Sequence, residues 1–323
     1  MDLRPALGDT GAGDGEEDEM RLDDLPQSDN IEDRRGDESG GGGGGMGMGG
    51  RGGLGIGAIV VLGIIGYALG IDPRLLIGGA EMLSGGSQQH APSAPAGKTG
   101  APSDDMGKFV SRVLGSADAQ WKLIFEQSGQ RYRAPTLVMF SGATRADACG
   151  QAQSAMGPFY CPSDQKIYLD TSFFRDLERR FKGCDAGSKS CQFAQAYVIA
   201  HEVGHHIQNQ LGILPKVQQQ QRGLSKAEAN RIQVKVELQA DCFAGVWANK
   251  SDQQWKFIEP GDVEAAMKTA AAIGDDRLQK QAQGYVIPDS FTHGSSEQRQ
   301  RWFQTGLKSG TVGACNTFAA QQL

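Results

Sequence analysis

The chain has 323 residues and a formal net charge of −6, from 32 Lys and Arg against 38 Asp and Glu. Residues 1–53 alone carry 14 Asp and Glu and 5 Arg, a net charge of −9, so the remainder carries +3 (−6 minus −9). This nearly neutral remainder lacks the clustered Lys and Arg of a nucleic-acid-binding surface, so we expect no nucleic-acid partner. The length fits one sizeable domain with appendages.

Residues 1–53 are acidic and end in a glycine-rich run, residues 40–53. A segment of this composition buries too little apolar surface to offset the entropy lost on ordering. We therefore expect residues 1–53 to form a disordered tail.

Residues 54–71, LGIGAIVVLGIIGYALGI, are an uncharged apolar stretch of 18 residues. That is about the shortest helix that crosses a hydrocarbon layer of roughly 30 Å, so the stretch predicts one transmembrane helix. A cleaved signal peptide is the alternative, but 53 preceding residues exceed an ordinary charged leader and no clear small-residue cleavage site follows. Arg34, Arg35 and Arg51 outnumber Arg74, which favours a cytoplasmic N-terminus and a catalytic domain outside the cytoplasm, periplasmic or extracellular.

After the apolar stretch, residues 72–103 lead into a Ser, Gly, Ala and Pro-rich linker at residues 84–103. About 20 such residues span roughly 25 Å as a flexible coil, so the domain would stay near the bilayer. Residues 104–323 are long enough to bury a complete core.

Six cysteines all follow the apolar stretch. An even number in an exported domain indicates disulfides, whereas six buried or free thiols would suit a cytosolic enzyme. Because no CxxC pair is present, a zinc ribbon is not expected. Six cysteines allow 15 pairings. Proximity in sequence favours Cys149 with Cys161, Cys184 with Cys191, and Cys242 with Cys315.

Helical periodicity dominates residues 104–323, and short strands are expected at Thr136–Phe140 and Lys166–Leu169. The sequence therefore predicts an α+β fold, mainly helical with a small sheet. Helices are expected at residues 106–114, 117–127, 172–181, 192–211 and 225–249, behind Pro260-Gly261, and from Ser295, which has capping-box spacing with Gln298.

The segment HEVGHH, residues 201–206, has the pattern of a catalytic zinc site. On a helix, His201 and His205 are one turn apart on the same face and can bind one ion. Glu202 lies beside this face, where it can act as general base toward a water at the metal. Gly204 leaves room for another element to approach. His206 points about 100° away, as a solvent-exposed or supporting histidine would.

A third ligand is expected on the next helix, within VELQADCFAG. Glu237 and Asp241 are one turn apart in a largely apolar segment, where acidic residues indicate a specific role. Glu237 would complete a His, His, Glu set with one position open to water. Asp241 could accept a hydrogen bond from a ligating histidine and fix its tautomer. Glu228 is the nearest competitor, but its surroundings are polar.

The segments HEVGHHIQ, ELQADCFAG and SFTHGSSEQR, behind a glycine-rich stretch and one apolar helix, resemble the bacterial family of neutral zinc metallopeptidases. The resemblance covers nearly the whole chain from residue 54 onward and leaves the acidic tail outside. More broadly, the helix pair is similar to the gluzincins, whose third ligand lies in a Glu-x-x-x-Asp pattern like Glu237 and Asp241. The resemblance implies a zincin-like fold with Zn²⁺, and a sheet whose edge strand pairs with substrate. Residues 159–170 are the candidate for that strand.

His293 lies in FTHGSSEQR, directly before an expected helix. It could stabilise the oxyanion of a tetrahedral intermediate, a role that some similar zincins give to a distal histidine, or it could hold the loop structurally. The expected function is a zinc endopeptidase acting on peptides or proteins at the outer face of the bacterial cytoplasmic membrane. Two alternatives remain: a non-catalytic envelope scaffold held by zinc, and a zinc hydrolase of non-peptide amides.

Overall fold

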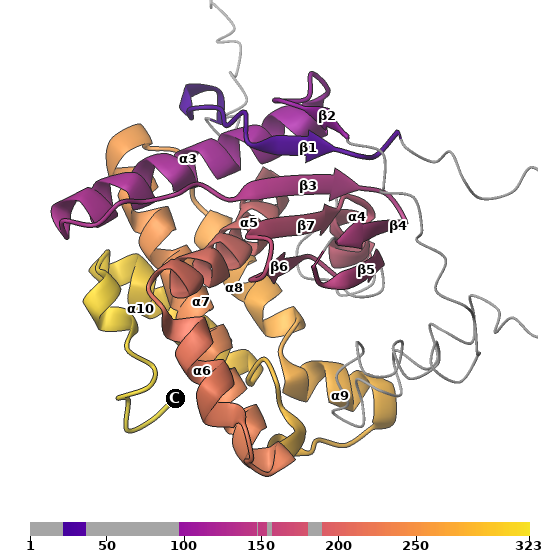
Figure 1. Ribbon diagram of the computed structural model, residues 1–323, viewed down its shortest axis with the longest axis vertical. Coiled ribbons are helices and arrows are strands. Elements are labelled where there is room, and N and C mark those ends of the chain that lie inside the picture. The colour runs from indigo at the N-terminus through magenta and orange to yellow at the C-terminus, as the bar shows by residue number, and fades with distance from the viewer. Residues whose placement is uncertain (1–21, 37–96, 147, 154–156, 180–188) are drawn as a thin grey trace, which may run out of the picture.

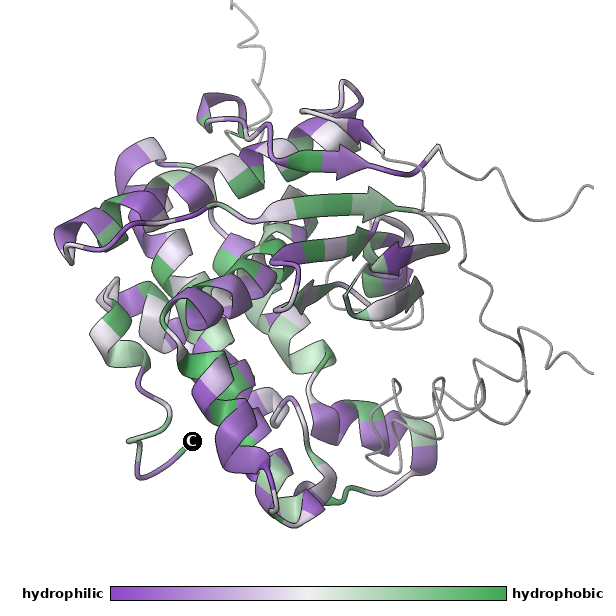
Figure 2. Cartoon of the chain, in the orientation of Figure 1, coloured by the Kyte–Doolittle hydropathy of each residue, from purple (hydrophilic) through white to green (hydrophobic). Residues whose placement is uncertain are grey.

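The computed structural model describes residues 22–36, 97–146, 148–153, 157–179 and 189–323. Within these ranges, a small mixed sheet lies along one side of a larger group of helices (Figure 1). Apolar side chains from both parts share one main core. Hydrophobic residues, green in Figure 2, are frequent in the central strands of the sheet. The described residues therefore confirm the predicted α+β class, mainly helical with a small sheet.

The main sheet has five described strands in the order β2-β1-β3-β7-β6. The central pair, β3 and β7, is parallel and buried from the second residue of each strand on, as expected for strands covered on both faces. Strand β6 pairs antiparallel with β7, so the segment expected as one edge strand, residues 159–170, is two strands. The bounds are β1 Ile31–Asp33, β2 Lys98–Thr99, β3 Thr136–Phe140, β6 Phe159–Cys161 and β7 Lys166–Asp170, and a separate hairpin joins β4 Ala143–Ala146 to β5 Gly150–Gln153.

Most helices begin where the sequence predicts. Ser225 and Ser295 each cap a helix, and both form the reciprocal hydrogen bonds of a capping box. The two helices expected between residues 106 and 127 are one helix, while α6 and α9 were not expected. The bounds are α3 Asp105–Gln127, α4 Ser172–Arg179, α5 Lys189–Gln210, α6 Ile213–Gln221, α7 Lys226–Trp255, α8 Asp262–Ala272, α9 Asp275–Gln283 and α10 Ser296–Ser309, with 3-10 turns η1 Leu22–Asp24, η3 Pro288–Ser290 and η4 Val312–Cys315.

Residues 22–36 belong to the folded domain, so the prediction of a disordered tail is wrong for this segment. Ile31 is buried where β1 pairs in parallel with β3. The Ser28 amide donates to the Ser111 hydroxyl of α3 at 3.1 Å, and that hydroxyl donates back to the Ser28 carbonyl at 2.9 Å. These bonds satisfy buried backbone groups of an otherwise polar segment.

The charges of this N-terminal segment are also paired. Arg35 bridges Asp33 and the α3 cap Asp104, each at 2.6 Å. Glu32 accepts from Lys166 of β7 at 3.0 Å. Because Asp104 and Lys166 lie far away in sequence, the composition of residues 1–53 alone did not reveal these partners.

Strand β2 lies in the expected linker and pairs antiparallel with β1, with Lys98 opposite Asp33. The chain therefore leaves the sheet after β1 and returns to it beside β1. A single membrane crossing within residues 54–71 would put β1 and β2 on opposite sides, which conflicts with this pairing. Residues 54–71 themselves lie outside the described ranges, and no helix within those ranges is long and apolar enough to span a membrane.

We predict that both termini of the full-length protein lie on one side of any membrane it contacts, because β1 and β2 are neighbours in one sheet. Epitope tags at the N-terminus and the C-terminus should become accessible to protease together, either in intact spheroplasts or only after lysis. Tags found on opposite sides would show that β1 is not part of the domain's sheet.

Two of the expected disulfides are present among the described residues. Cys149–Cys161 joins the β4–β5 hairpin to β6, and Cys242–Cys315 joins α7 to η4. Cys191 is also disulfide-bonded, while Cys184 lies outside the described ranges. The second bond closes a sequence separation of 73 residues and holds the C-terminal turn against α7.

Small residues let three helices approach closely around the middle of α7. A Cβ placed on Gly204 of α5 would lie 2.9 Å from the carbonyl oxygen of Ala240 on α7. A Cβ on Gly306 of α10 would overlap the carbonyl of Cys242, on the same part of α7. The backbones of α5 and α10 thus approach α7 closely near Glu237 and Asp241.

We predict that Gly204→Ala destabilises the domain, although alanine ordinarily favours a helix interior by about 1 kcal/mol. The added methyl group would push α5 from the backbone of α7, at a net cost of about 1–3 kcal/mol. The free energy of unfolding in denaturant measures this cost. Gly313→Ala is the matched control, because a Cβ there meets nothing within 4 Å. Equal stability of both variants would contradict the close contact.

Candidate metal centre

Three side chains from two helices converge at the centre of the domain. His201 and His205 lie one turn apart on α5, with ring centroids 4.8 Å apart and ring planes at 88°. Glu237 reaches them from α7, and the three potential ligand atoms lie within 4.8 Å of one another. The structure therefore brings together the three residues expected to bind zinc, and they could hold one metal ion.

In both histidines, Nδ1 is hydrogen-bonded to a neighbouring side chain. His201 Nδ1 lies 2.8 Å from Asp241 Oδ1, and His205 Nδ1 lies 2.9 Å from Gln208 Oε1. The Gln208 amide nitrogen donates to the Val236 carbonyl, so Oε1 is the acceptor that faces His205. Each Nδ1 therefore carries a proton and each Nε2 faces Glu237, so Nε2 is the nitrogen that could bind a metal, as in a ligating histidine.

A hydrogen bond also orients the Glu237 carboxylate. Its Oε1 accepts a hydrogen bond from Gln233 at 2.9 Å, one turn earlier on α7. Its Oε2 lies 3.3 Å from His201 Nε2 and 3.4 Å from His205 Nε2. Burial alone would raise the pKa of Glu237, but the two histidines hold it well below its usual range. The ligand set thus fits a divalent cation at this point.

The pKa of His205 also reflects its attraction to the Glu237 carboxylate. Burial alone would lower the pKa of this imidazole, but the Glu237 carboxylate outweighs it and raises the pKa to about 9. A proton and a metal ion therefore compete for the same ring nitrogen. Glu228, the competing candidate for the third ligand, is instead the exposed partner of the Ser225 capping box.

Glu202 is buried beside the ligands and has one unsatisfied oxygen. Among the described residues, its Oε2 has no hydrogen-bond partner. A buried carboxylate oxygen without a partner costs free energy unless a water or ligand group fills the position. Glu202 directly follows His201 in sequence, at the position that carries the base in an HEXXH site.

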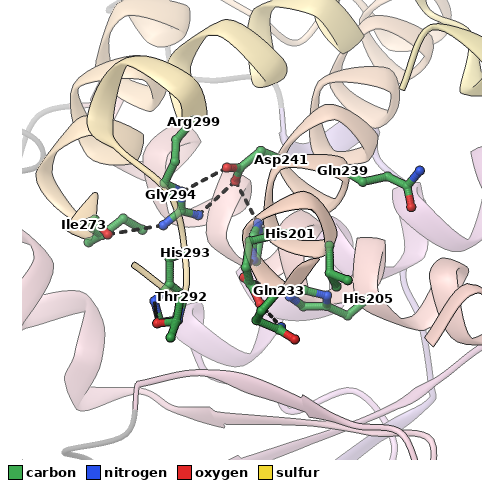
Figure 3. Close-up of polar contacts among 12 residues, drawn as sticks. His201, His205, Gln233, Gln239, Asp241, Ile273, Thr292, His293, Gly294 and Arg299 are labelled. Carbon is green, nitrogen blue, oxygen red and sulfur yellow. Dashed lines mark hydrogen bonds and ion pairs between the residues drawn. The ribbon is translucent and has the colours of Figure 1, made fainter. Parts of the chain in front are cut away.

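A buried charge network holds Asp241. Arg299 of α10 donates from Nε to Oδ2 and from Nη2 to Oδ1, both at 2.9 Å (Figure 3). The Tyr197 hydroxyl donates to Oδ1 at 2.5 Å and accepts from Arg299 at 3.1 Å. Although burial raises the pKa of Asp241, Arg299 and His201 outweigh it and keep the group ionised. Asp241 therefore holds His201, as expected from the sequence.

Arg299 and Tyr197 were missed in the sequence analysis. Arg299 lies within the segment SFTHGSSEQR, and its position one turn into a capped helix was visible, but an arginine there resembles an ordinary surface charge. Tyr197 lies one turn before His201 on α5, and this i, i+4 spacing was the available signal. Only the packing of α10 on α7 reveals the partners.

His293 lies near His201 in Figure 3. It stands on a loop held by Asp275. Asp275 Oδ2 accepts the backbone N–H groups of Thr292, His293 and Gly294 at 2.7, 2.6 and 3.1 Å. Asp275 Oδ1 lies 3.3 Å from His293 Nδ1, and the imidazole is 40% exposed. The loop is thus rigidly held while its imidazole remains accessible from solvent.

His206 is fully buried, so the interpretation of a solvent-exposed histidine is wrong. Its Nε2 lies 2.7 Å from the Arg133 carbonyl, and its Nδ1 lies 3.1 Å from the Tyr160 hydroxyl of β6. Burial lowers the pKa of His206 to about 4, so the ring stays neutral. The residue next to a metal-site histidine therefore bonds to the sheet.

An HEXXH helix whose histidines face a carboxylate on a neighbouring helix, with a second buried glutamate next to the first histidine, is typical of a metallopeptidase-type zinc centre. Residues 20–318 match the profile of a family described as "Putative neutral zinc metallopeptidase". The chain belongs to this family. Because the match starts at residue 20, the docked segment 22–36 is inside it, contrary to the expectation that the acidic tail lies outside.

The chain is similar in sequence to curated relatives over most of their length. The chain is 48% identical over 299 residues to the Escherichia coli K12 protein named "Uncharacterized protein YpfJ", covering 93% of this chain and 99% of that protein. It is 41% identical over 239 residues to the Mycobacterium bovis protein named "Uncharacterized protein Mb2605", covering 70% of this chain and 75% of that protein. No solved structure matches the chain.

We predict that Asp241→Asn weakens zinc binding by roughly 10–100-fold, because an amide holds the His201 tautomer less firmly and leaves Arg299 without its counter-charge. Competition with a chromophoric chelator measures the affinity. Asp289→Asn, which alters an exposed ion pair with Arg231, is the matched control and should bind zinc as the wild type does. Unchanged affinity in Asp241→Asn would contradict the supporting role of this carboxylate.

Proposed function

We propose that the chain is a zinc-dependent endopeptidase, with zinc held by His201, His205 and Glu237. The observation that carries the proposal is the unsatisfied, buried Oε2 of Glu202 near three potential ligands whose ligand atoms converge within 4.8 Å of one another. A structural zinc site is usually closed by four protein ligands. Three ligands and an unpaired carboxylate favour an open site where water can react.

In this proposal, each residue has one task. Bound zinc would lower the pKa of a water toward about 7 and polarise the scissile carbonyl. Glu202 accepts the proton of the attacking water on its free Oε2 and later delivers it to the leaving amine. Asp241 and Gln208 keep the two histidines in the ligating tautomer throughout.

His293 is proposed to stabilise the oxyanion of the tetrahedral intermediate. Its backbone is fixed by Asp275, and its ring lies beside Glu237 closely enough to affect that carboxylate's pKa. A donor that is already oriented costs no reorganisation when negative charge develops on the substrate. The solvent-accessible ring supports this role over a purely structural one.

The substrate is proposed to be an extended peptide that pairs with β6. This strand is the terminal strand of the described sheet and pairs antiparallel with β7. A strand at the end of a sheet can bind an extended chain through main-chain hydrogen bonds. Peptides are favoured over other amides because only they supply this repeating pattern.

We further propose that the enzyme acts outside the bacterial cytoplasm. Disulfides Cys149–Cys161 and Cys242–Cys315 support this proposal, because such bonds persist in oxidising compartments. The predicted contact of residues 54–71 with a lipid bilayer stays a prediction. Such a contact must begin and end on the side that holds β1 and β2.

We predict that Glu202→Gln retains zinc but lowers the rate of peptide hydrolysis by about 10²–10⁴-fold, because an amide cannot accept the proton of water. Metal analysis together with cleavage of a proteome-derived peptide library, on the full-length protein, measures both quantities. Glu228→Gln is the matched control, since glutamine also completes a capping box. Full activity in Glu202→Gln would refute the assignment of the base.

A further inference from the structure

A series of side-chain amides connects the C-terminal turn of the domain to His205 of the candidate metal centre. Gln239 Nε2 donates to the Cys315 carbonyl of η4 at 2.9 Å, and Gln239 Oε1 accepts from Gln208 Nε2 at 3.1 Å. Gln208 Oε1 lies 2.9 Å from His205 Nδ1. Gln208 is fully buried and Gln239 is 5% exposed. These hydrogen bonds form one buried path, the amide relay, from Cys315 to His205.

Two backbone carbonyls fix the direction of every hydrogen bond in the amide relay. A carbonyl oxygen can only accept, so Gln239 must turn its Nε2 toward Cys315 and its Oε1 toward Gln208. Gln208 Nε2 has a second acceptor, the Val236 carbonyl at 2.7 Å. Because both amide protons of Gln208 are bound, its Oε1 faces His205 Nδ1, and that nitrogen donates.

Gln239 supplies the second of the two acceptors that orient the Gln208 amide. Without it, Gln208 would keep its hydrogen bond to Val236, while its other amide proton would lose its acceptor. A buried donor without a partner is costly, so the amide would rotate toward other acceptors. Such rotation moves Oε1 away from His205 Nδ1 and loosens the ring that presents Nε2 to Glu237.

The other end of the amide relay is held covalently. Cys315 is fully buried and disulfide-bonded to Cys242, which lies three residues after Gln239 on the same face of α7. The Thr317 hydroxyl donates at 2.7 Å to the carbonyl of Lys235, one turn before Gln239. The C-terminal turn therefore presents a fixed carbonyl to Gln239.

We propose that Gln239 is a positioning residue for the metal centre, joining the disulfide-held C-terminal turn to Gln208 and thereby holding His205 in the orientation that binds zinc. Both polar atoms of Gln239 are bonded within the amide relay, so it acts through Gln208. The inference rests on the zinc site of the proposed function and does not depend on peptide cleavage. It also gives the Cys242–Cys315 bond a task at this site, because that bond fixes the carbonyl to which Gln239 donates.

The test compares Gln239→Met, Gln208→Met and the double variant in the full-length protein. Methionine is flexible and unbranched but lacks the amide donor and acceptor. Zinc affinity, measured by competition with a chromophoric chelator, should fall about 10–100-fold in Gln208→Met and about five- to tenfold in Gln239→Met. The double variant should match Gln208→Met within about twofold, because both changes break the same path.

Gln120→Met is the matched control. Gln120 is also a buried glutamine, on α3, and its amide donates to Gln254 at 2.7 Å, outside the amide relay. This variant loses a buried hydrogen bond of the same kind, so it should lose stability as Gln239→Met does and still bind zinc as the wild type does.

A second measurement observes His205 directly. In the zinc-loaded wild type, the Nδ1–H proton of this ring should give a slowly exchanging NMR signal, as should the side-chain amide protons of Gln239. The His205 signal should shift and exchange faster in Gln239→Met, and it should stay unchanged in Gln120→Met. Rapid exchange of the Gln239 amide protons in the wild type would overturn the inference without any variant.

Additive losses of zinc affinity in the double variant, or equal losses in Gln239→Met and Gln120→Met, would overturn the inference in favour of a general structural role. Unchanged affinity together with an unchanged His205 signal in Gln239→Met would also overturn it. A wild type that binds no zinc overturns the proposed zinc site and this inference together. Failure of the zinc-loaded wild type to cleave peptides contradicts the proposed enzyme alone, so the two failures are distinguishable.

Discussion

The buried ion pair between Asp241 and Arg299 is the interaction on which the candidate metal centre depends. Two charges removed from water cost several kcal/mol each unless hydrogen bonds satisfy them. Here the bidentate arginine, Tyr197 and His201 together occupy both carboxylate oxygens. The pair requires α5, α7 and α10 to meet in one arrangement, and that arrangement orients His201.

The close approach of the helices follows from this requirement. An arginine on α10 reaches Asp241 only if α10 lies against α7, and Gly306 permits this contact. Gly204 does the same for α5, which brings its histidines to Glu237. The Cys242–Cys315 bond then fixes η4, directly after α10, to α7. Residues without catalytic groups thus determine whether the ligands converge.

Local sequence patterns predicted the parts of the site that lie on single helices. The spacing of His201 and His205, and the capping box at Ser295, depend on residues within a few positions of one another. The partners across elements could not be predicted in this way. Arg299 has the sequence context of a surface charge, and the hydroxyl of Tyr160 contacts His206 on α5, 46 residues away. Such contacts depend on tertiary packing, which periodicity does not encode.

The N-terminal segment shows why composition misjudged the domain boundary. Residues 22–36 are acidic, but their few apolar side chains, Leu22, Leu25 and Ile31, are buried against the rest of the domain. At the other end, the Thr317 hydroxyl donates to the Lys235 carbonyl of α7 at 2.7 Å. The family match, residues 20–318, spans both contacts. Because β1 separates β2 from β3 in the sheet, a domain cut at residue 104 would lose two strands from one edge. The folded unit therefore includes residues on both sides of residues 37–96, and the two strands that flank this segment are neighbours in one sheet.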